Sequence, residues 1–242
     1  MPARFEGKVA LVAGGDDAIG RAGALAFARQ GATVVVAGTD ARKLDATVRT
    51  IRHGGGRAES IVTDVTRDGK DAAAHMVAVT VERCGGLDIA FNNVTVTGPA
   101  RPVADTCETV WTELLAHNLT GVWTSMKHEI AYMKEHRGGV IVNTACNLLS
   151  NGVRPGLGAY AASKAALTTL TRAAAGEYIA DGIRINAISP GPAEEPGTTG
   201  PRPAGQDHAT ADEVADSVVW LCSDESAFVV GHDLVLDRKR AA

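Results

Sequence analysis

Aromatic residues are scarce in this chain. Phe, Trp and Tyr make up only 4% of its 242 residues, although hydrophobic residues of all kinds make up 45%. This balance is typical of a soluble protein whose core is built from Val, Ile, Leu and Ala. The length is sufficient for one large α/β domain or for two small ones.

Long apolar runs, clustered cysteines and an excess of positive charge are also missing. The apolar run Val9–Ala13 is too short for a signal peptide or a membrane-spanning segment. The four cysteines show no CxxC or Cys/His spacing, which argues against a disulfide framework or a zinc site and fits a reducing cytoplasm. The histidines do not cluster, so we expect no metal site. A net charge of −4 gives no electrostatic reason to expect nucleic acid as a partner.

Short apolar runs alternate with helical patterns along the whole chain. Runs rich in Val and Ile predict strands at residues 9–13, 33–38, 58–62, 87–91, 140–144, 184–189 and 234–236. Apolar residues at helical spacing predict helices at residues 19–30, 42–53, 70–84, 109–135, 160–180 and 211–223. Such alternation specifies a parallel sheet covered by helices on both faces, so we expect one doubly wound α/β domain over residues 1–242. The proline-rich stretch from Pro190 to Asp207 predicts a surface loop.

A glycine-bearing turn follows the first predicted strand and reads Gly14-Gly15-Asp16-Asp17-Ala18-Ile19-Gly20. Between a buried strand and a helix, such a turn lets backbone N–H groups approach a pyrophosphate at the helix N-terminus. An ordinary tight turn would also explain the glycines. The position of the turn, first in the sheet, favours nucleotide binding.

Polar residues stand at other places where sheets of this kind bind ligands. Asp64 follows the third strand and could accept a hydrogen bond from an adenine amino group, although a turn or N-cap role explains it equally well. Asn92 and Asn93 end the fourth strand at the carboxyl edge of the sheet. Asn118 lies inside a predicted helix, where Asn is disfavoured. It is either a surface residue or a polar group turned inward to hold water.

Tyr160 and Lys164 are four residues apart and therefore share one face of a predicted helix. A free phenol, with a pKa of about 10, is a poor acid–base catalyst at neutral pH. A cation held beside the phenol favours the phenolate and lowers that pKa. The pair is thus a candidate for proton transfer, although any amphipathic helix can carry a Tyr and a Lys at this spacing.

Taken in order, these motifs resemble those of the short-chain dehydrogenase/reductase family over essentially the whole chain. The resemblance rests on Gly14-x-x-x-Ala18-Ile19-Gly20, Asp64, Asn92-Asn93, Asn118, Tyr160-x-x-x-Lys164 and Pro190-Gly191. It implies a single Rossmann-type domain with about seven parallel strands, assembled as a homotetramer or homodimer. It also implies hydride transfer between a nicotinamide ring and an alcohol or carbonyl carbon of a small molecule.

The resemblance also implies roles for individual residues. Tyr160 would be the general acid–base, Lys164 would lower its pKa and bind the nicotinamide ribose, and Asn118 would hold a water in the proton relay. Binding of the cofactor is implied for Gly14, Asp17, Ile19, Gly20, Thr39, Asp64, Val65, Asn92, Tyr160, Lys164, Pro190 and Gly191. Within that set, adenine would meet Asp64 and Val65, the adenosine ribose would meet Asn92, and Pro190-Gly191 would flank the nicotinamide.

The sequence departs from the family at the serine that holds the substrate oxygen. Counting from the fifth strand puts Cys146 at this position, and counting back from Tyr160 puts Asn147 there. We favour Cys146, because strand register is more rigid than loop length. A thiol is a weak donor, and an amide has a different reach. Loss of one such donor costs on the order of 3–4 kcal/mol of transition-state stabilisation.

Three further departures concern the surroundings of the site. Ala18 stands at the third conserved position of the turn, where the family has glycine, and Val94-Thr95 stand where the family has smaller residues. The segment that forms the substrate lid in the family, residues 190–208, is short and rich in proline and glycine. A short lid would leave the site more open.

The end of the second strand normally separates NAD from NADP. This chain reads Gly38-Thr39-Asp40 there, with neither the usual acid nor an adjacent arginine. Asp17 stands where NADP-dependent members often place a basic residue and would repel a 2′-phosphate. We therefore expect NAD rather than NADP.

The leading hypothesis is an NAD(P)-dependent oxidoreductase that acts on a secondary alcohol or ketone. The alternative is a nucleotide-binding protein with weak or no catalysis, because the usual substrate-orienting serine is absent. A third possibility is a chain that binds no dinucleotide.

Overall fold

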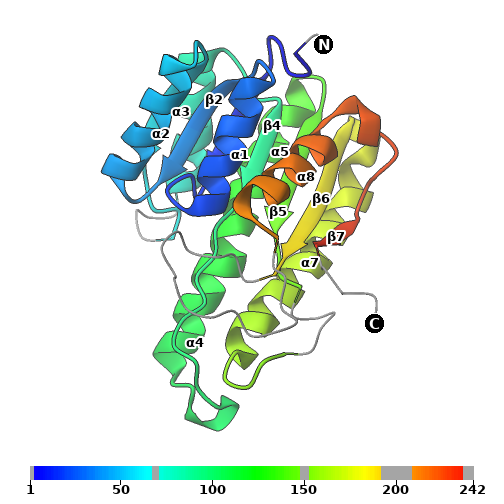
Figure 1. Ribbon diagram of the computed structural model, residues 1–242. Coiled ribbons are helices and arrows are strands. Elements are labelled where there is room, and N and C mark those ends of the chain that lie inside the picture. Colours follow the sequence, from blue (N-terminus) through cyan, green and yellow to red (C-terminus); the bar gives the residue numbers. More distant parts are fainter. Residues whose placement is uncertain (1–2, 67–70, 148–152, 192–208, 237–242) are drawn as a thin grey trace, which may run out of the picture.

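The sheet is the organising element of the structure, a computed structural model that describes residues 3–66, 71–147, 153–191 and 209–236. Within these residues seven parallel strands form one sheet in the order β3-β2-β1-β4-β5-β6-β7 (Figure 1). The strands are β1 (Val9–Ala13), β2 (Thr33–Gly38), β3 (Arg57–Val62), β4 (Ile89–Asn92), β5 (Gly139–Thr144), β6 (Ile183–Pro190) and β7 (Asp233–Leu236). The expected doubly wound α/β fold is confirmed.

Helices cover both faces of the sheet. One face carries α1 (Ala18–Arg29), α2 (Ala41–His53) and α8 (Ala211–Cys222). The other carries α3 (Ala72–Cys84), α5 (Val122–Glu135) and α7 (Gly158–Tyr178). Helix α4 (Glu108–Leu115) precedes α5, and short 3-10 segments lie at Val103–Asp105, Ile179–Asp181 and Asp224–Ser226.

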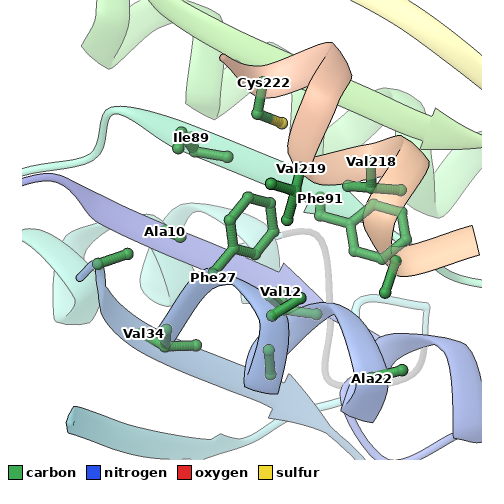
Figure 2. Packing of buried hydrophobic residues seen from close by; sticks show 14 of the residues in the cluster. Ala10, Val12, Ala22, Phe27, Val34, Ile89, Phe91, Val218, Val219 and Cys222 are labelled. Atoms are coloured by element: carbon green, nitrogen blue, oxygen red, sulfur yellow. The ribbon is translucent and has the colours of Figure 1, made fainter. Parts of the chain in front are cut away.

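The alternation of side chains along each strand divides the core into two layers. In β1, Ala10 and Val12 face α1 and α8, whereas Leu11 and Ala13 face α3 and α5. Figure 2 shows the first layer, where Phe27 of α1 packs among strand residues and α8. Because both faces are covered, the central strands β1 and β2 consist almost entirely of apolar residues, which gives them a clear signal in the sequence.

The helix expected at residues 109–135 is interrupted. Between α4 and α5 the backbone forms a π segment, Ala116–Gly121, that contains the fully buried Asn118. The side chain of Asn118 is hydrogen-bonded to both backbone groups of Val96, on the loop after β4. A π segment widens one helical turn, and such segments are frequent at functional sites.

The order of the strands places a crevice beside β1. The chain runs from β1 outward to β2 and β3 on one side and to β4 and the remaining strands on the other. At such a reversal the loops after neighbouring strands diverge and leave room for a ligand at the carboxyl edge. Helix α4 and the first turn of α7 extend past this edge (Figure 1). The expected lid is described only at Pro190 and Gly191, since residues 192–208 lie outside the described part of the chain.

Candidate active site

The turn between β1 and α1 depends on two glycines. Gly14 has a φ of 76°, and a Cβ there would collide with the carbonyl oxygen of Asn93. A Cβ on Gly20 would collide with the carbonyl oxygen of Gly14. These close approaches bring the first turn of α1 against the end of β1 and the loop after β4.

Asp17 caps the N-terminus of α1. Its Oδ1 accepts from the Gly20 N–H at 2.7 Å, and its carboxylate also accepts from Asn93 Nδ2 at 2.8 Å. Removal of water around the carboxylate raises the pKa of Asp17, and the hydrogen bonds from Gly20 and Asn93 oppose that shift. The expected repulsion of a 2′-phosphate by Asp17 does not fit this placement, because the side chain points to the helix N-terminus and to Asn93 instead of the end of β2.

Two adjoining cavities run along the carboxyl edge of the sheet. The larger, about 810 Å³, extends from the β1–α1 turn to Tyr160 and is also lined by Ile19, Cys146, Asn147, Pro190 and Gly191. The smaller, about 370 Å³, is lined by Gly14, Thr39, Asp64 and Val65. Both linings include Asp16, Asp17, Asn93 and Thr95, so the cavities meet at the crevice.

The residues expected at the adenine end are brought together in the smaller cavity. Asp64 and Val65 line it, beside Thr39 from the end of β2. Asp64 Oδ1 accepts hydrogen bonds from the backbone N–H and the hydroxyl of Thr66. The turn role considered for Asp64 is therefore present, and the residue also faces the cavity.

Asn92 is not at the cavity surface. It is buried, and its Nδ2 donates to Glu129 Oε2 at 3.0 Å and to Asn143 Oδ1 at 3.1 Å. Strand alternation explains this: Asn92 is two residues from Ala90, which faces the α3 and α5 layer. The expected contact of Asn92 with a ribose is thus not supported by the geometry, and the neighbouring Asn93 lines both cavities instead.

Tyr160 lies at the wall of the larger cavity, against Cys146. Their side chains are hydrogen-bonded, and this bond raises the pKa of Tyr160. Burial is the main cause of the raised pKa, followed by the charge and the hydrogen bond of Cys146. Of the two replacements considered for the serine, the structure brings Cys146 to Tyr160. The amide of Asn147 donates to Leu236 O at 3.4 Å, although Asn147 also lines the cavity.

Lys164 is fully buried one turn along α7. Its Nζ donates to Val94 O at 2.9 Å, Thr95 Oγ1 at 3.0 Å and Thr144 O at 2.8 Å, which satisfies all three donors of an ammonium group. Burial lowers the pKa of Lys164 to about 7. The named causes of the Tyr160 pKa shift are burial and Cys146, so the expected effect of Lys164 on Tyr160 stays a prediction.

Asn118 is turned inward, as one of the two interpretations held. Its Nδ2 donates to Val96 O at 2.8 Å and to Ser163 Oγ at 3.1 Å, so both N–H groups are used. It therefore links the loop after β4 to α7, which carries Tyr160 and Lys164. A water in a proton relay would have to donate a hydrogen bond either to Asn118 Oδ1, which can accept one more, or to a backbone carbonyl of the π segment.

No individual role in the site was predicted for Asn93, Thr95 or Thr144, although Asn93 was placed with Asn92 at the carboxyl edge of the sheet. They hold neighbouring loops together, since Thr144 Oγ1 donates to Asn93 Oδ1 at 2.9 Å and Thr95 accepts from Lys164. The period of two in β4 could have identified Asn93, because it separates Asn93 from the inward-facing Asn92. Thr95 and Thr144 carry no comparable sequence signal.

The donor set fits a dinucleotide at both ends of the crevice. The smaller cavity offers Asp64 and Thr39 to an adenosine, and the larger one brings Tyr160 and Cys146 beside the positions of Pro190 and Gly191. A pyrophosphate would lie at the N-terminus of α1. There it would share the Ile19 and Gly20 N–H groups with the Asp17 carboxylate, which accepts hydrogen bonds from both.

The described part of the chain contains no cluster of three or more His, Cys, Asp or Glu residues suited to a metal ion. Among the same residues no helix is long and apolar enough to cross a membrane.

Comparisons with known proteins show which family the chain resembles over its length. Residues 13–238 match a family model described as "Enoyl-(Acyl carrier protein) reductase". A short chain dehydrogenase/reductase of Aspergillus oryzae is 34% identical, with 96% of this chain and 94% of the relative covered. Cis-4-hydroxycyclohexanecarboxylate dehydrogenase of Sinomonas cyclohexanicum is also 34% identical, with 98% of each chain covered.

A solved structure of NAD+-bound xylitol dehydrogenase superposes with a TM-score of 0.89 at 30% identity and covers 97% of this chain and 99% of that one. With the glycine turn, Tyr160 and Lys164 assembled at one edge of the sheet, the chain belongs to the short-chain dehydrogenase/reductase family, whose members are oxidoreductases that act on CH–OH groups.

Proposed function

We propose that this protein transfers a hydride between NAD and a secondary alcohol or ketone of a small molecule, with Tyr160 as the general acid–base. The observation that carries the proposal is the position of Tyr160 in the wall of the larger cavity, one helical turn from Lys164 and opposite the β1–α1 turn. Two similar proteins, one named for a hydroxycyclohexanecarboxylate and the other for xylitol, are dehydrogenases by name.

In the proposed reaction a bound nicotinamide supplies or accepts the hydride. In reduction the Tyr160 hydroxyl donates its proton to the ketone oxygen as the carbon gains the hydride, and Tyr160 is then reprotonated from solvent. In oxidation Tyr160 takes the hydroxyl proton. The raised pKa of Tyr160 keeps the phenol protonated at neutral pH, which suits the reductive direction.

In this proposal Lys164 and Asn118 hold the elements around Tyr160 in place. Lys164 holds the loop after β4 to the end of β5 through the carbonyl groups of Val94 and Thr144. Asn118 fixes α7 relative to the loop after β4. Cys146 is the group proposed to hold the substrate oxygen, because it is the side chain in contact with Tyr160.

The alternative function remains a nucleotide-binding protein with weak or no catalysis. The observation that favours it is Cys146 itself: a thiol is a weaker donor than the serine hydroxyl it replaces. Its contact with the phenol also holds the Tyr160 proton more tightly.

A steady-state assay of the full chain against a panel of secondary alcohols with NAD+, and of ketones with NADH, tests the proposal. We expect turnover that can be followed by nicotinamide absorbance, together with saturable NADH binding in calorimetry. NADH binding without turnover on the panel would favour the alternative, and absence of binding to all four nicotinamide forms would refute both.

We also propose a homotetramer or homodimer in the cytoplasm. Trp111 of α4 and Trp123 of α5 are 44% and 47% exposed, which is the kind of apolar surface that a second copy covers. The four cysteines are free, as is usual in a reducing compartment. Light scattering on the purified chain gives the number of copies.

A further inference from the structure

The end of β2 has no side chain of its own, and the carboxylate of Asp16 occupies that space. A Cβ placed on Gly38, the last residue of β2, would collide with Oδ1 and Cγ of Asp16. Asp16 belongs to the β1–α1 turn, so its side chain crosses from one loop to the next. In sheets of this type an acidic residue near the end of the second strand binds the ribose 2′-hydroxyl of NAD. Here a carboxylate stands in that region but comes from the turn after β1.

Three donors fix the Asp16 carboxylate, and all of them bind the same oxygen. Oδ2 accepts from the Thr39 N–H at 2.8 Å, the Asp40 N–H at 2.9 Å and the Thr39 hydroxyl at 3.1 Å. Among the described residues no hydrogen bond to Oδ1 is present. The carboxylate is thus held in one orientation while Oδ1 retains its capacity to accept. Asp16 lines both cavities, at the point where they meet.

We infer that Asp16 selects between the two nicotinamide cofactors. This inference rests on the proposed function and adds the residue that decides its cofactor. Oδ1 accepts a hydrogen bond from the ribose 2′-hydroxyl of NAD, and the fixed negative charge repels the 2′-phosphate of NADP. Asp17, which lies next to it, is directed to the N-terminus of α1 and does not perform this selection.

Two cations line the larger cavity together with Asp16, so we expect mutation of Asp16 to reverse the selection. Arg21 of α1 and Lys43 of α2 line the same cavity. Each would attract a 2′-phosphate if the carboxylate were absent. Removal of the Asp16 charge should therefore increase affinity for NADPH as well as decrease affinity for NADH.

The test is calorimetric titration of the full chain with NADH and with NADPH at one fixed salt concentration. Asp16→Asn keeps an oxygen for the donors of Thr39 and Asp40 but removes the charge. The matched control is Asp40→Asn, which removes the same charge from a nearby residue that lines neither cavity and retains an N-cap for α2. We expect the wild type to prefer NADH by about tenfold or more, the size of one charge-assisted hydrogen bond. Asp16→Asn should lower that ratio at least about tenfold, and Asp40→Asn should leave it nearly unchanged.

A second substitution separates recognition from a structural role. If Asp16 only clamped the two turns, Asp16→Asn would weaken both cofactors equally or neither, and the ratio would stay constant, which would overturn the inference. Lys43→Ala in the Asp16→Asn background should reduce the gained NADPH affinity. A wild type that prefers NADPH would also overturn the inference. A wild type that binds neither cofactor would refute the proposed function itself, which is a distinct outcome.

Discussion

At the scale of single residues, Cys146 has the largest expected effect on the catalytic rate. It touches Tyr160, and its charge and hydrogen bond both raise the pKa of that phenol beyond the effect of burial. A serine at this position would donate more strongly to a phenolate and to a substrate oxygen. The chain therefore has the proton-transfer group of its family with a weaker partner beside it.

Cys146→Ser should lower the pKa of Tyr160, because a hydroxyl that donates to the phenolate favours the charged form. In the oxidative direction the active form is the phenolate, so the rise of kcat/KM with pH should move to lower pH. The rate at neutral pH should increase, by up to about a hundredfold if the donor is fully restored. The measurement is the pH profile of alcohol oxidation.

Cys107→Ser is the control for this substitution, since Cys107 is exposed and lines neither cavity. Its profile should match that of the wild type. A Cys146→Ser profile that also matches the wild type would show that Cys146 does not face the reacting oxygen.

At the scale of elements, the site depends on how closely α1 approaches β1. Gly20 lies in the first turn of α1, and a Cβ there would meet the backbone carbonyl of Gly14, which no rotation of a side chain can relieve. The same turn supplies the helix N-terminus that would face a pyrophosphate. The close contact between Gly20 and Gly14 therefore contributes to the stability of the fold and to cofactor binding.

Gly20→Ala should lower the free energy of unfolding by about 1–3 kcal/mol, the usual cost of overpacking, and should weaken NADH binding. Gly176→Ala in α7 is the matched control, because a Cβ there meets nothing within 4 Å. It should raise the free energy of unfolding by about 0.5–1 kcal/mol, since alanine is the better helix former. Urea denaturation measures both, and equal effects of the two substitutions would contradict the contact.

Element patterns were predictable where one physical signal dominated. The buried strands and the amphipathic α2 followed from periodicity alone. The π segment did not, because it depends on Asn118 finding the backbone of Val96, a partner from a loop 22 residues away. The contacts of Asp16 were unpredictable for the same reason. Its partners Thr39 and Asp40 are more than 20 residues away in the sequence, and only the folded sheet brings them within hydrogen-bonding distance of Asp16.

At the scale of the whole molecule, one buried carboxyl group makes stability depend on pH. Glu129 of α5 is fully buried, and its Oε2 accepts from Asn92. Among the described residues Glu129 Oε1, Asn92 Oδ1 and Ser125 Oγ are without hydrogen-bond partners. Burial raises the pKa of Glu129 to about 7. Since the unfolded chain releases this proton near the ordinary pKa, the folded state binds more protons between these two values, and stability falls as pH rises through that window.

Glu129→Gln should flatten this dependence, because the amide is neutral at every pH. We expect the wild type to lose about 2.5 kcal/mol relative to the variant between pH 5 and pH 8. Urea denaturation of both proteins at several pH values measures it, and subtraction of the two curves cancels the contributions of other titrating groups. Parallel curves would show that Glu129 titrates normally.

The central claim is that Tyr160 transfers the proton in an NAD-dependent oxidoreductase. Single-turnover reduction of the best ketone of the panel by enzyme-bound NADH tests it most directly, with the wild type compared with Tyr160→Phe. NADH affinity is measured in parallel by calorimetry. The account predicts that the variant binds NADH within a few-fold of the wild type but loses at least about a hundredfold in the rate of hydride transfer. A Tyr160→Phe variant that retains the wild-type rate would contradict it.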